Sequence, residues 1–510
     1  MGGLRHWVTV LLIASMTAPC AFAGAQPARK KPPQPDWLRF VNEAYTLSPN
    51  FSPEEKADLL LDMLDVPALS QEQKERWSLE IFSLATKDIR PSHYRAAMQK
   101  NALVALCKVN PEKAAALYTT QDTPEMWHQD VLMEDYRAFG ARTLFPALWA
   151  QSRMASIPTI RSIANWIGST GEYPFAAVAI IIQDIPKSHD QEAETLASDA
   201  IASYRTTESF LNKASEFTNF ILAIHKRVRP TLIRQAIEAE LASLDALEKS
   251  DEHAHVVIRA ASSQQTVQFS KLADYVVYRL LPIMELIDPA WAQSVRDKYA
   301  VVRNVPSQSA KEPIALTAVV ALPGEASNST ETAAAMDEHR LMQVSMFASS
   351  NPAKAEAIAE TIQDPGPRAV ALATVAPEFR TSDPQKYEGW LKQSNNQLQS
   401  LPPGITKLKL MLALARDSML AGDQKRAMEL FQKAFDLGEE LFAEDLRSNP
   451  GKMAYEGTGE EELAKLSEVF AKYPDTRVAT MARVRSTRDD VLKARLLVAA
   501  AKGAAPASAS

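Results

Sequence analysis

Helical periodicity dominates residues 37–303 and 337–498. Apolar side chains recur there at three- and four-residue spacing, which places them on one face of an α-helix. Helix starts are marked as well, because Ser52-Pro53-Glu54-Glu55 and Ser70-Gln71-Glu72-Gln73 are capping boxes. In such a box, the serine and the side chain three residues later satisfy unpaired backbone N–H groups. The pattern predicts an all-α chain.

A second helix-start signal recurs along the chain. An Asn or Asp that can cap a helix precedes a proline, which is tolerated at the first helical position. These pairs are Asn110-Pro111, Asp288-Pro289, Asn351-Pro352, Asp383-Pro384 and Asn449-Pro450. The last four lie 63, 32 and 66 residues apart, which are close to multiples of a period near 33. That period is the size of a helix-turn-helix unit in a solenoid.

Gln-Asp followed by proline occurs three times, at Gln121-Asp122, Gln183-Asp184 and Gln363-Asp364. Each copy closes an Ala-rich run of about two helical turns. Proline ends helices, and the residue before it avoids the α region. A catalytic aspartate is needed once, so three copies indicate helix ends in a repetitive fold. The aspartate is then available to cap the following helix.

Residues 408–441 read LKLMLALARDSMLAGDQKRAMELFQKAFDLGEEL. Ala415 is a small residue in the first of two expected helices, and Gly422-Asp423 forms the turn. The second helix has the spacing A-x3-F-x2-A, carried by Ala427, Phe431 and Ala434. In these features the segment resembles one tetratricopeptide repeat.

The segment departs from that family at Ser418, where an aromatic residue is usual, and at Glu439, where proline often ends the unit. The resemblance covers this one unit of the chain. It implies an α-solenoid segment, and solenoids of this family usually hold a protein or peptide in a concave groove.

Further hairpins are predicted at residues 160–186 and 460–485, where two helical stretches flank a turn. Residues 304–336 break the periodicity with Pro, Ser, Thr and Asn. We therefore expect an N-terminal array over 37–303, an irregular segment over 304–336 and a C-terminal array over 337–498. Within the irregular segment, IALTAVVAL is compatible with a short strand or a buried helix. The predicted fold is an α-solenoid of stacked helix hairpins, tetratricopeptide-like or HEAT-like.

The two ends of the chain have a different character. Residues 1–23 have a positive start, an apolar core and small residues before Gly24, which predicts a secretory signal peptide. Cys20 raises the alternative of a lipid anchor, but Pro19 stands where a lipobox has a small residue. Residues 24–36 are a Pro- and Lys-rich linker, and residues 499–510 are expected to form a disordered tail. We expect a periplasmic or secreted protein.

Composition narrows the function. The 510 residues contain 16 glycines and carry a net charge of −6. Scarce glycine disfavours phosphate-cradling loops and nucleophile elbows, and the charge gives no basic footprint for nucleic acid. No stretch is long and apolar enough for a transmembrane segment. Once a signal peptide is removed, Cys107 is the remaining cysteine, and it is expected to be a buried apolar side chain rather than a reactive thiol.

The candidate chemical motifs are weak. Asp251-Glu252-His253-Ala254-His255 could ligate a metal only if extended, because helical residues two apart point in different directions. Gly451-Lys452 lacks the hydroxyl residue of a phosphate-binding loop, and Gly457-Thr458-Gly459 before three glutamates indicates a helix start. The basic run from His225 to Pro230 is typical of a helix end, with an anion or partner site as the alternative.

The sequence therefore predicts an exported scaffold or adaptor that recognises a protein or peptide partner. It assigns no catalytic, cofactor-binding or metal-binding residue, and no cofactor. Trp166, Tyr173 and Arg416 are surface candidates for a binding face, although core packing explains the two aromatic residues equally well. The alternative function is an exported α/α-toroid carbohydrate-active or cell-wall enzyme, which would use paired carboxylates.

Overall fold

The computed structural model describes residues 34–90, 92–121, 135–206, 211–250, 255–261, 266–299, 319–321, 333–448 and 458–506. The chain divides into two compact units, Met1–Pro35 and Asp36–Ser510. All of the described helices and strands belong to the second unit. The predicted signal peptide, most of the linker, and residues 507–510 of the expected tail lie outside the described residues.

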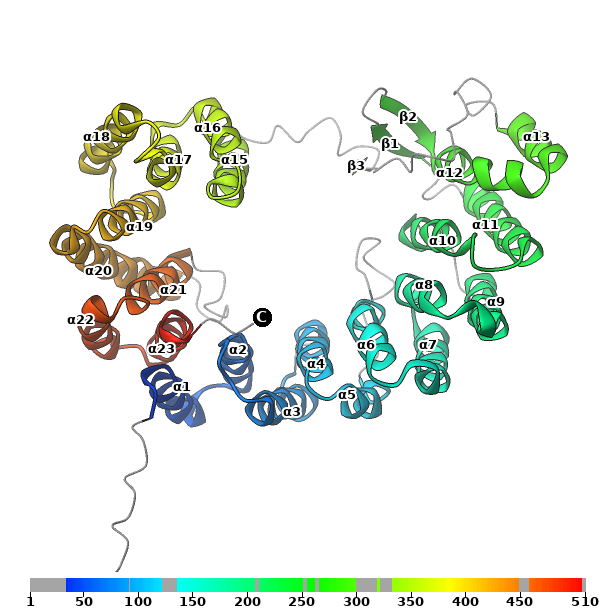
Figure 1. Cartoon of the computed structure of the whole chain (residues 1–510), viewed down its shortest axis with the longest axis horizontal. Coiled ribbons are helices and arrows are strands. Elements are labelled where there is room, and N and C mark those ends of the chain that lie inside the picture. The colour runs from blue at the N-terminus through cyan, green and yellow to red at the C-terminus, as the bar shows by residue number, and fades with distance from the viewer. Residues whose placement is uncertain are drawn as a thin grey trace, which may run out of the picture. The chain divides into compact units, whose positions relative to one another are not determined.

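Helix hairpins stack into two rows, as the all-α solenoid prediction requires (Figure 1). In row A each helix packs against the next one named here. Row A contains α15 (Ala333–Phe347), α17 (Pro365–Val375), α19 (Ile405–Leu420), α21 (Thr458–Ala471), α23 (Asp490–Ala504), α2 (Pro53–Leu64), α4 (Ser92–Cys107), α6 (Tyr136–Ser152), α8 (Phe175–Asp184), α10 (Leu211–Ile224) and α12 (Leu272–Ile287).

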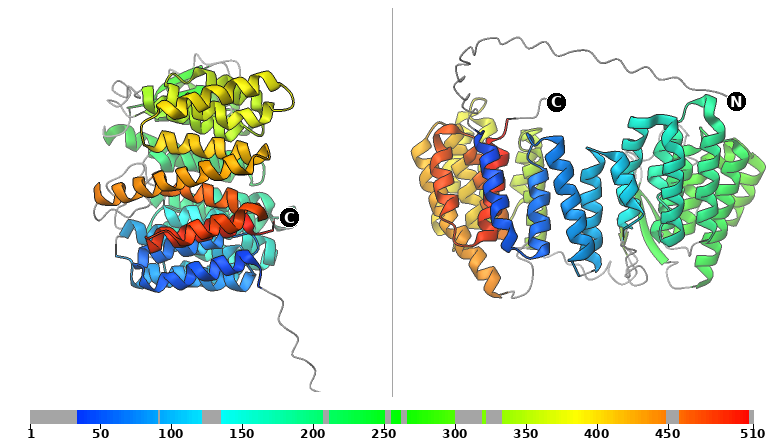
Figure 2. Two further views of the ribbon diagram at one scale, coloured as in Figure 1. Left: turned by 90° about the vertical axis from the view of Figure 1, so that its left-hand side faces the viewer. Right: turned by 90° about the horizontal axis from the view of Figure 1, so that it is seen from below.

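Row B supplies the second helix of each layer. Figure 2 shows helices of the stack side by side with similar axis directions. Row B contains α16 (Pro352–Thr361), α18 (Pro384–Ser400), α20 (Gln424–Ser448), α22 (Pro474–Arg485), α1 (Asp36–Leu47), α3 (Gln71–Lys87), α5 (Pro111–Tyr118), α7 (Ile157–Thr170), α9 (Asp190–Thr206), α11 (Pro230–Ser250) and α13 (Pro289–Lys298). Short 3-10 turns occur at Ser48–Asn50, Arg153–Ser156, Lys187–His189 and Ala376–Phe379.

Polar side-chain bridges join successive row B helices, and the sequence separation of the bridged residues reflects the length of the repeat. Lys386 of α18 lies 2.8 Å from Glu356 of α16, and Lys113 of α5 lies 2.8 Å from Glu75 of α3. Further bridges are Arg426–Asn395, Tyr45–Glu80 and Arg161–Asp199. The paired residues are 30 to 38 positions apart in sequence, which agrees with the predicted period near 33.

Local helix-start chemistry forms as predicted. Both capping boxes, at Ser52 and Ser70, are complete. The side chains that cap the proline-started helices are Asn110, Asp288, Asn351 and Asp383. The fifth pair, Asn449-Pro450, lies outside the described residues.

The Gln-Asp copies mark helix ends. In two of them, α8 ends at Asp184, and α16 ends at Thr361 just before Gln363-Asp364. Asp364 alone of these two aspartates caps the next helix, by accepting from the Gly366 N–H. The Asp184 side chain does not cap the following helical turn, whose N-cap is Pro186. Asp122 lies outside the described residues.

The last helix packs against the first two. α23 contacts α21 and α22 on one side and α1 and α2 on the other (Figure 1). It extends to Ala504, so the predicted end of the array at residue 498 is wrong. The reason is burial: Ala499, Ala500 and Ala501 are inside the core, and Gly503 lies so close to the Glu468 carbonyl that a Cβ would be 1.9 Å from its oxygen. The larger hydrophobic core runs from Phe40 to Ala501, and a second, smaller core lies among α15, α16 and α17.

A small sheet interrupts the helices. It consists of β1 (His255–Ala261), β2 (Thr266–Lys271) and β3 (Val319–Ala321), in the antiparallel order β2-β1-β3. Phe269 of β2 is buried against Tyr275 and Tyr278 of α12. β3 falls within IALTAVVAL, so that stretch contains a strand rather than a helix over these residues. The rest of the 304–332 segment is outside the described residues.

The tetratricopeptide-like segment forms a helix hairpin from α19 and α20. The Gly422 N–H donates to the Met419 carbonyl and the Asp423 N–H to the Ser418 carbonyl, the paired bonds of a Schellman motif. Gly422 has φ +82°, and Asp423 accepts from the Arg426 N–H. The helices meet through small or aromatic side chains, all fully buried: Ala415, Ala427, Phe431 and Ala434.

Gly422→Ala is expected to lower the free energy of unfolding by about 1–2 kcal/mol, because an L-residue is strained in the left-handed region. A Cβ at this position has open space around it, so the loss measures backbone strain. Gly389→Ala is the matched control, since it lies inside α18 with equally open space. It should be stabilising by up to about 1 kcal/mol. Denaturant unfolding of both variants checks the signs, and two losses of equal size would contradict the turn assignment.

Candidate functional site

The three proposed surface residues differ in position. Arg416 is exposed on α19, as predicted. Trp166 is half-buried, with the Arg137 guanidinium 5.1 Å from its ring centre. Tyr173 is 2% exposed and packs 5.1 Å from the Phe175 ring, so its surface assignment is wrong and the core alternative is correct. Tyr173 lies just before α8, and its ring packs against Phe175 at the start of that apolar helix.

Cys107 is buried at the end of α4 and forms no disulfide. Burial raises the pKa of its thiol to about 12. Because the thiolate is the reactive form, Cys107 is an apolar core residue, as the sequence indicates.

The basic run between α10 and α11 is engaged by acids of α9. Arg227 lies 2.7 Å from Asp190 and donates to the Ile185 carbonyl at 2.6 Å. Arg229 lies 3.3 Å from Glu194. These contacts fit the helix-end interpretation, because the two arginines hold neighbouring repeats together.

The remaining weak motifs lie partly outside the described residues. Residues 251–254 and Gly451-Lys452 are outside them, and His255 begins β1. Thr458 starts α21 with Glu460 and Glu461 in its first turn, which confirms the predicted helix start. Within the described ranges, no group of three His, Cys, Asp or Glu side chains could hold a metal ion. Likewise, no described helix is long and apolar enough to cross a bilayer.

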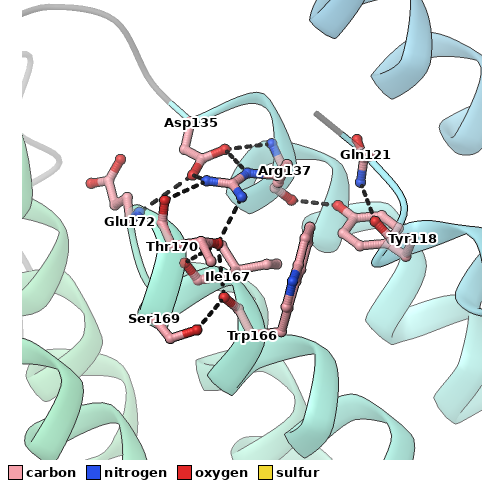
Figure 3. A network of polar contacts seen from close by, with 9 residues as sticks. All are labelled: Tyr118, Gln121, Asp135, Arg137, Trp166, Ile167, Ser169, Thr170 and Glu172. Carbon is pink, nitrogen blue, oxygen red and sulfur yellow. Dashed lines mark hydrogen bonds and ion pairs between the residues drawn. The ribbon is translucent and has the colours of Figure 1, made fainter. Parts of the chain in front are cut away.

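A buried ion pair between Asp135 and Arg137 organises the turn between α7 and α8 (Figure 3). Both side chains are at most 1% exposed, and Arg137 Nη2 lies 2.8 Å from Asp135 Oδ2. Asp135 caps α6 by accepting from the Arg137 N–H, and it also accepts from the Glu172 N–H. Arg137 in turn donates to the Thr170 hydroxyl and carbonyl.

The Gly171 backbone packs closely against this pair. A Cβ on Gly171 would lie 2.3 Å from Arg137 Nη2 and 2.5 Å from Asp135 Oδ2. The Tyr118 hydroxyl donates to the Arg137 carbonyl, and burial raises the pKa of Tyr118 well above its usual value. The pair therefore fastens one repeat to the next. Sequence reasoning missed it, because an Asp and an Arg two residues apart carry no distinctive signal.

A cluster of carboxylates lies where α21 and α23 meet α2. Arg495 of α23 lies 2.5 Å from Glu460 and 3.6 Å from Asp58, and the Tyr94 hydroxyl donates to Asp58 at 2.6 Å. Burial raises the pKa values of Asp58, Asp62 and Glu460, against the opposing effect of Arg495. Paired carboxylates are what the alternative enzyme would need. Here two of the acids are held by Arg495 between the two ends of the chain.

Glu240 is a buried acid on α11 with no exposed surface. Burial raises the pKa of its carboxyl to about 8, against the lowering effects of Tyr204, Thr218 and Lys213. The Thr218 hydroxyl donates to Glu240 Oε1 at 3.0 Å. The carboxyl is therefore largely protonated at neutral pH, and it links α10 to α11 within the core.

Exposed apolar side chains gather on row A. Among the described residues, six of the eight large hydrophobic side chains that are exposed belong to row A helices. These six are Phe139, Ile180, Leu286, Met342, Met346 and Leu420. The two on row B are Leu446 and Val478. Since exposed apolar side chains are more frequent on row A helices than on row B helices, we take row A as the candidate interaction surface.

Phe139 was not among the predicted surface residues, although a helical wheel of α6 shows that it lies off the apolar face of the helix. The core face of α6 includes Ala138, Ala141, Leu144 and Leu148. Phe139 lies off that face, beside Arg142 and Thr143 in the helical sequence. An aromatic residue off the apolar face of a helix is a candidate contact residue.

No protein-family model and no curated protein sequence matches this chain. A search of solved structures finds similarity to a circular tandem repeat protein with novel repeat topology and enhanced subunit contact surfaces. That protein is 12% identical, and the alignment covers 90% of this chain and 94% of the other, with a TM-score of 0.16.

Arg495→Gln is expected to reduce the free energy of unfolding by about 3 kcal/mol, because it leaves buried carboxylates without their cation. Hydrogen exchange should quicken most in α1, α2 and α23. The control is Arg485→Gln, which removes the exposed ion pair with Glu43 and should cost less than about 1 kcal/mol. Equal effects of the two changes would show that the cluster does not hold the junction.

Glu240→Gln should weaken the pH dependence of stability. The folded-state pKa is raised from 4.5 to about 8, so the contribution of the carboxyl to stability is complete below pH 4.5 and is lost as pH rises towards 8. Urea unfolding between these values should show a smaller fall in unfolding free energy for Glu240→Gln than for the wild type. Glu238→Gln, an exposed change on the same helix, should keep the wild-type slope. An unchanged slope in Glu240→Gln would refute the assignment.

Proposed function

We propose that this protein is an exported helical-repeat scaffold that binds a protein or peptide partner through the row A surface. The observation that carries the proposal is the distribution of exposed large apolar side chains: within the described ranges, six lie on row A and two on row B. In a solenoid the stacked helices present such positions along one extended surface. A partner that spans several repeats would cover apolar area from each of them.

The interior supports a non-covalent role. The buried Asp135–Arg137 pair and Arg495 connect neighbouring helices, and Glu240 bonds to Thr218 within the core. These perturbed or charged groups therefore have structural partners. The tetratricopeptide-like unit at 408–441 adds support from its resemblance, because the usual work of that family is peptide binding. Export is proposed from the signal-peptide pattern of residues 1–23.

Site-specific photocrosslinking tests the proposal. A photoreactive amino acid would replace Phe139, Arg416 or Met342 on row A, and Leu446 or Val478 on row B, in protein spanning residues 24–510. All five positions are exposed, so folding should be preserved. After irradiation in an envelope extract, we expect discrete protein adducts from the row A positions only.

Two results would contradict the proposal. Adducts from the row B positions alone would show that the binding surface lies on row B and not on row A. Absence of any adduct, together with degradation of cell-wall or polysaccharide fractions by the protein, would favour the carbohydrate-active enzyme instead. Asp62→Asn and Glu460→Gln would then be the first variants for assays of hydrolysis.

A further inference from the structure

We propose that the junction between the two ends of the chain is proton-linked: it takes up protons when it closes, and it loosens as pH rises. The junction is formed by α23 of the C-terminal array and by α1 and α2 of the N-terminal array. Among the described helices, the main packing between the two arrays occurs here. The arrays are also connected through the chain, by residues 300–332. The inference concerns the stack itself and does not depend on a binding partner.

Three carboxylates and one guanidinium meet at the junction. Arg495 of α23 lies 2.5 Å from Glu460 of α21 and 3.6 Å from Asp58 of α2. Asp62 lies one helical turn beyond Asp58 on α2. The side chain of Asp58 is 17% exposed and that of Glu460 is 8% exposed. With all three acids ionised, one cation would therefore face three negative charges in a place that water reaches poorly.

The neighbouring charges leave this imbalance in place. The cations that act most strongly on the three acids are Arg495 and Lys502. Lys502 lies 3.6 Å from Asp65, which is an exposed acid at the end of α2, so this pair adds no net positive charge. The other groups that face the three acids, all on α2 or α4, are Glu54, Asp65 and Tyr94. Negative charge thus exceeds positive charge at the closed junction.

Burial and mutual repulsion favour the uncharged form of these acids. Burial raises the pKa values of Asp58, Asp62 and Glu460, and repulsion by Asp62 raises those of the other two further, against the lowering effect of Arg495. The ordinary values are 3.8 for aspartate and 4.5 for glutamate. An acid whose pKa is higher in the closed state stabilises that state fully below its ordinary value, and the contribution is lost as pH rises through the raised value. The junction is therefore tightest in mild acid.

Opening of this junction would separate the two arrays without unfolding them. In a repeat protein each layer contacts only its neighbours, so one interface opens while the others stay packed. Because α23 and α2 are consecutive helices of row A, an open junction would also divide the row A surface. Under the proposed function, a partner that spans the junction would then bind less tightly at high pH.

Amide hydrogen exchange of protein spanning residues 24–510 tests the inference. Dividing each observed rate by the intrinsic rate at the same pH gives the opening constant of each helix. Between about pH 5 and about pH 8, the opening constants of α1, α2 and α23 should rise at least about tenfold, because a tenfold difference in one acid constant between the closed and open states has this effect. Those of α17 and α18, in another layer of the stack, should change less than about twofold.

The double variant Asp62→Asn, Glu460→Gln leaves Asp58 as the one acid opposite Arg495, so opening of its junction should vary less than about threefold over the same pH range. The matched control is Glu461→Gln, which removes a 71% exposed acid beside Glu460 and should keep the wild-type dependence. Thermal unfolding establishes that each variant is folded, and Asp62→Asn alone, with a reduced dependence expected, serves if the double variant is not.

Three results would overturn the inference. They are a wild-type junction whose opening constant does not change with pH, an equal change in α17 and α18, and a double variant that keeps the full dependence. Crosslinking from row A positions would support the proposed scaffold function in each of these cases, since that experiment does not require the junction to open.

Discussion

The packing of α23 against α1 and α2 decides how the repeats are joined. A helix hairpin buries apolar faces on the repeats before and after it, so an array is stabilised by nearest-neighbour contacts. Here the layer that follows α21–α23 is formed by the first helices of the chain. Arg485 meets Glu43 and Arg495 meets Asp58 across this junction. The two arrays are therefore one stack, with the chain's first and last helices meeting inside it.

Because the last helices pack against the first ones, the two ends of the stack are formed by helices from the middle of the sequence. α15 lies at one end of row A and α12 at the other; α15 begins directly after residues 300–332, whereas α13 lies between α12 and that segment. Met342 and Met346 of α15 and Leu286 of α12 are exposed. Each of these two helices has a row A neighbour on one side only, and on α12 the strands β1 and β2 also pack against the helix. Phe139 and Ile180, in contrast, lie on interior helices that have row A neighbours on both sides.

The sequence predicted contacts between residues that are close together in the chain and missed contacts between residues that are far apart in it. Caps at Ser52 and Asn351 were predictable because the bonds join residues three apart. The bridge between Glu43 and Arg485 joins residues 442 apart, and no local pattern encodes such a contact. The end of α23 was missed for the same reason, since its alanines resemble a flexible tail until they are buried by other helices. The candidate surface was only partly predictable: Arg416 is exposed as expected, but Tyr173 is buried, and Phe139 required knowledge of which helix face is covered.

The two rows differ in their side-chain bridges and in the apolar side chains that they expose. Row B helices are connected by side-chain bridges such as Lys386–Glu356 and Arg483–Glu439, while row A carries most of the exposed apolar side chains. A single exposed ion pair contributes little, but several bridges between neighbouring row B helices together fix the register of these helices against each other. Row A residues that face solvent are then free to vary, because the buried faces and row B bridges already hold their helices. Under the proposed function, a partner would therefore contact row A positions whose side chains take no part in the row B bridges.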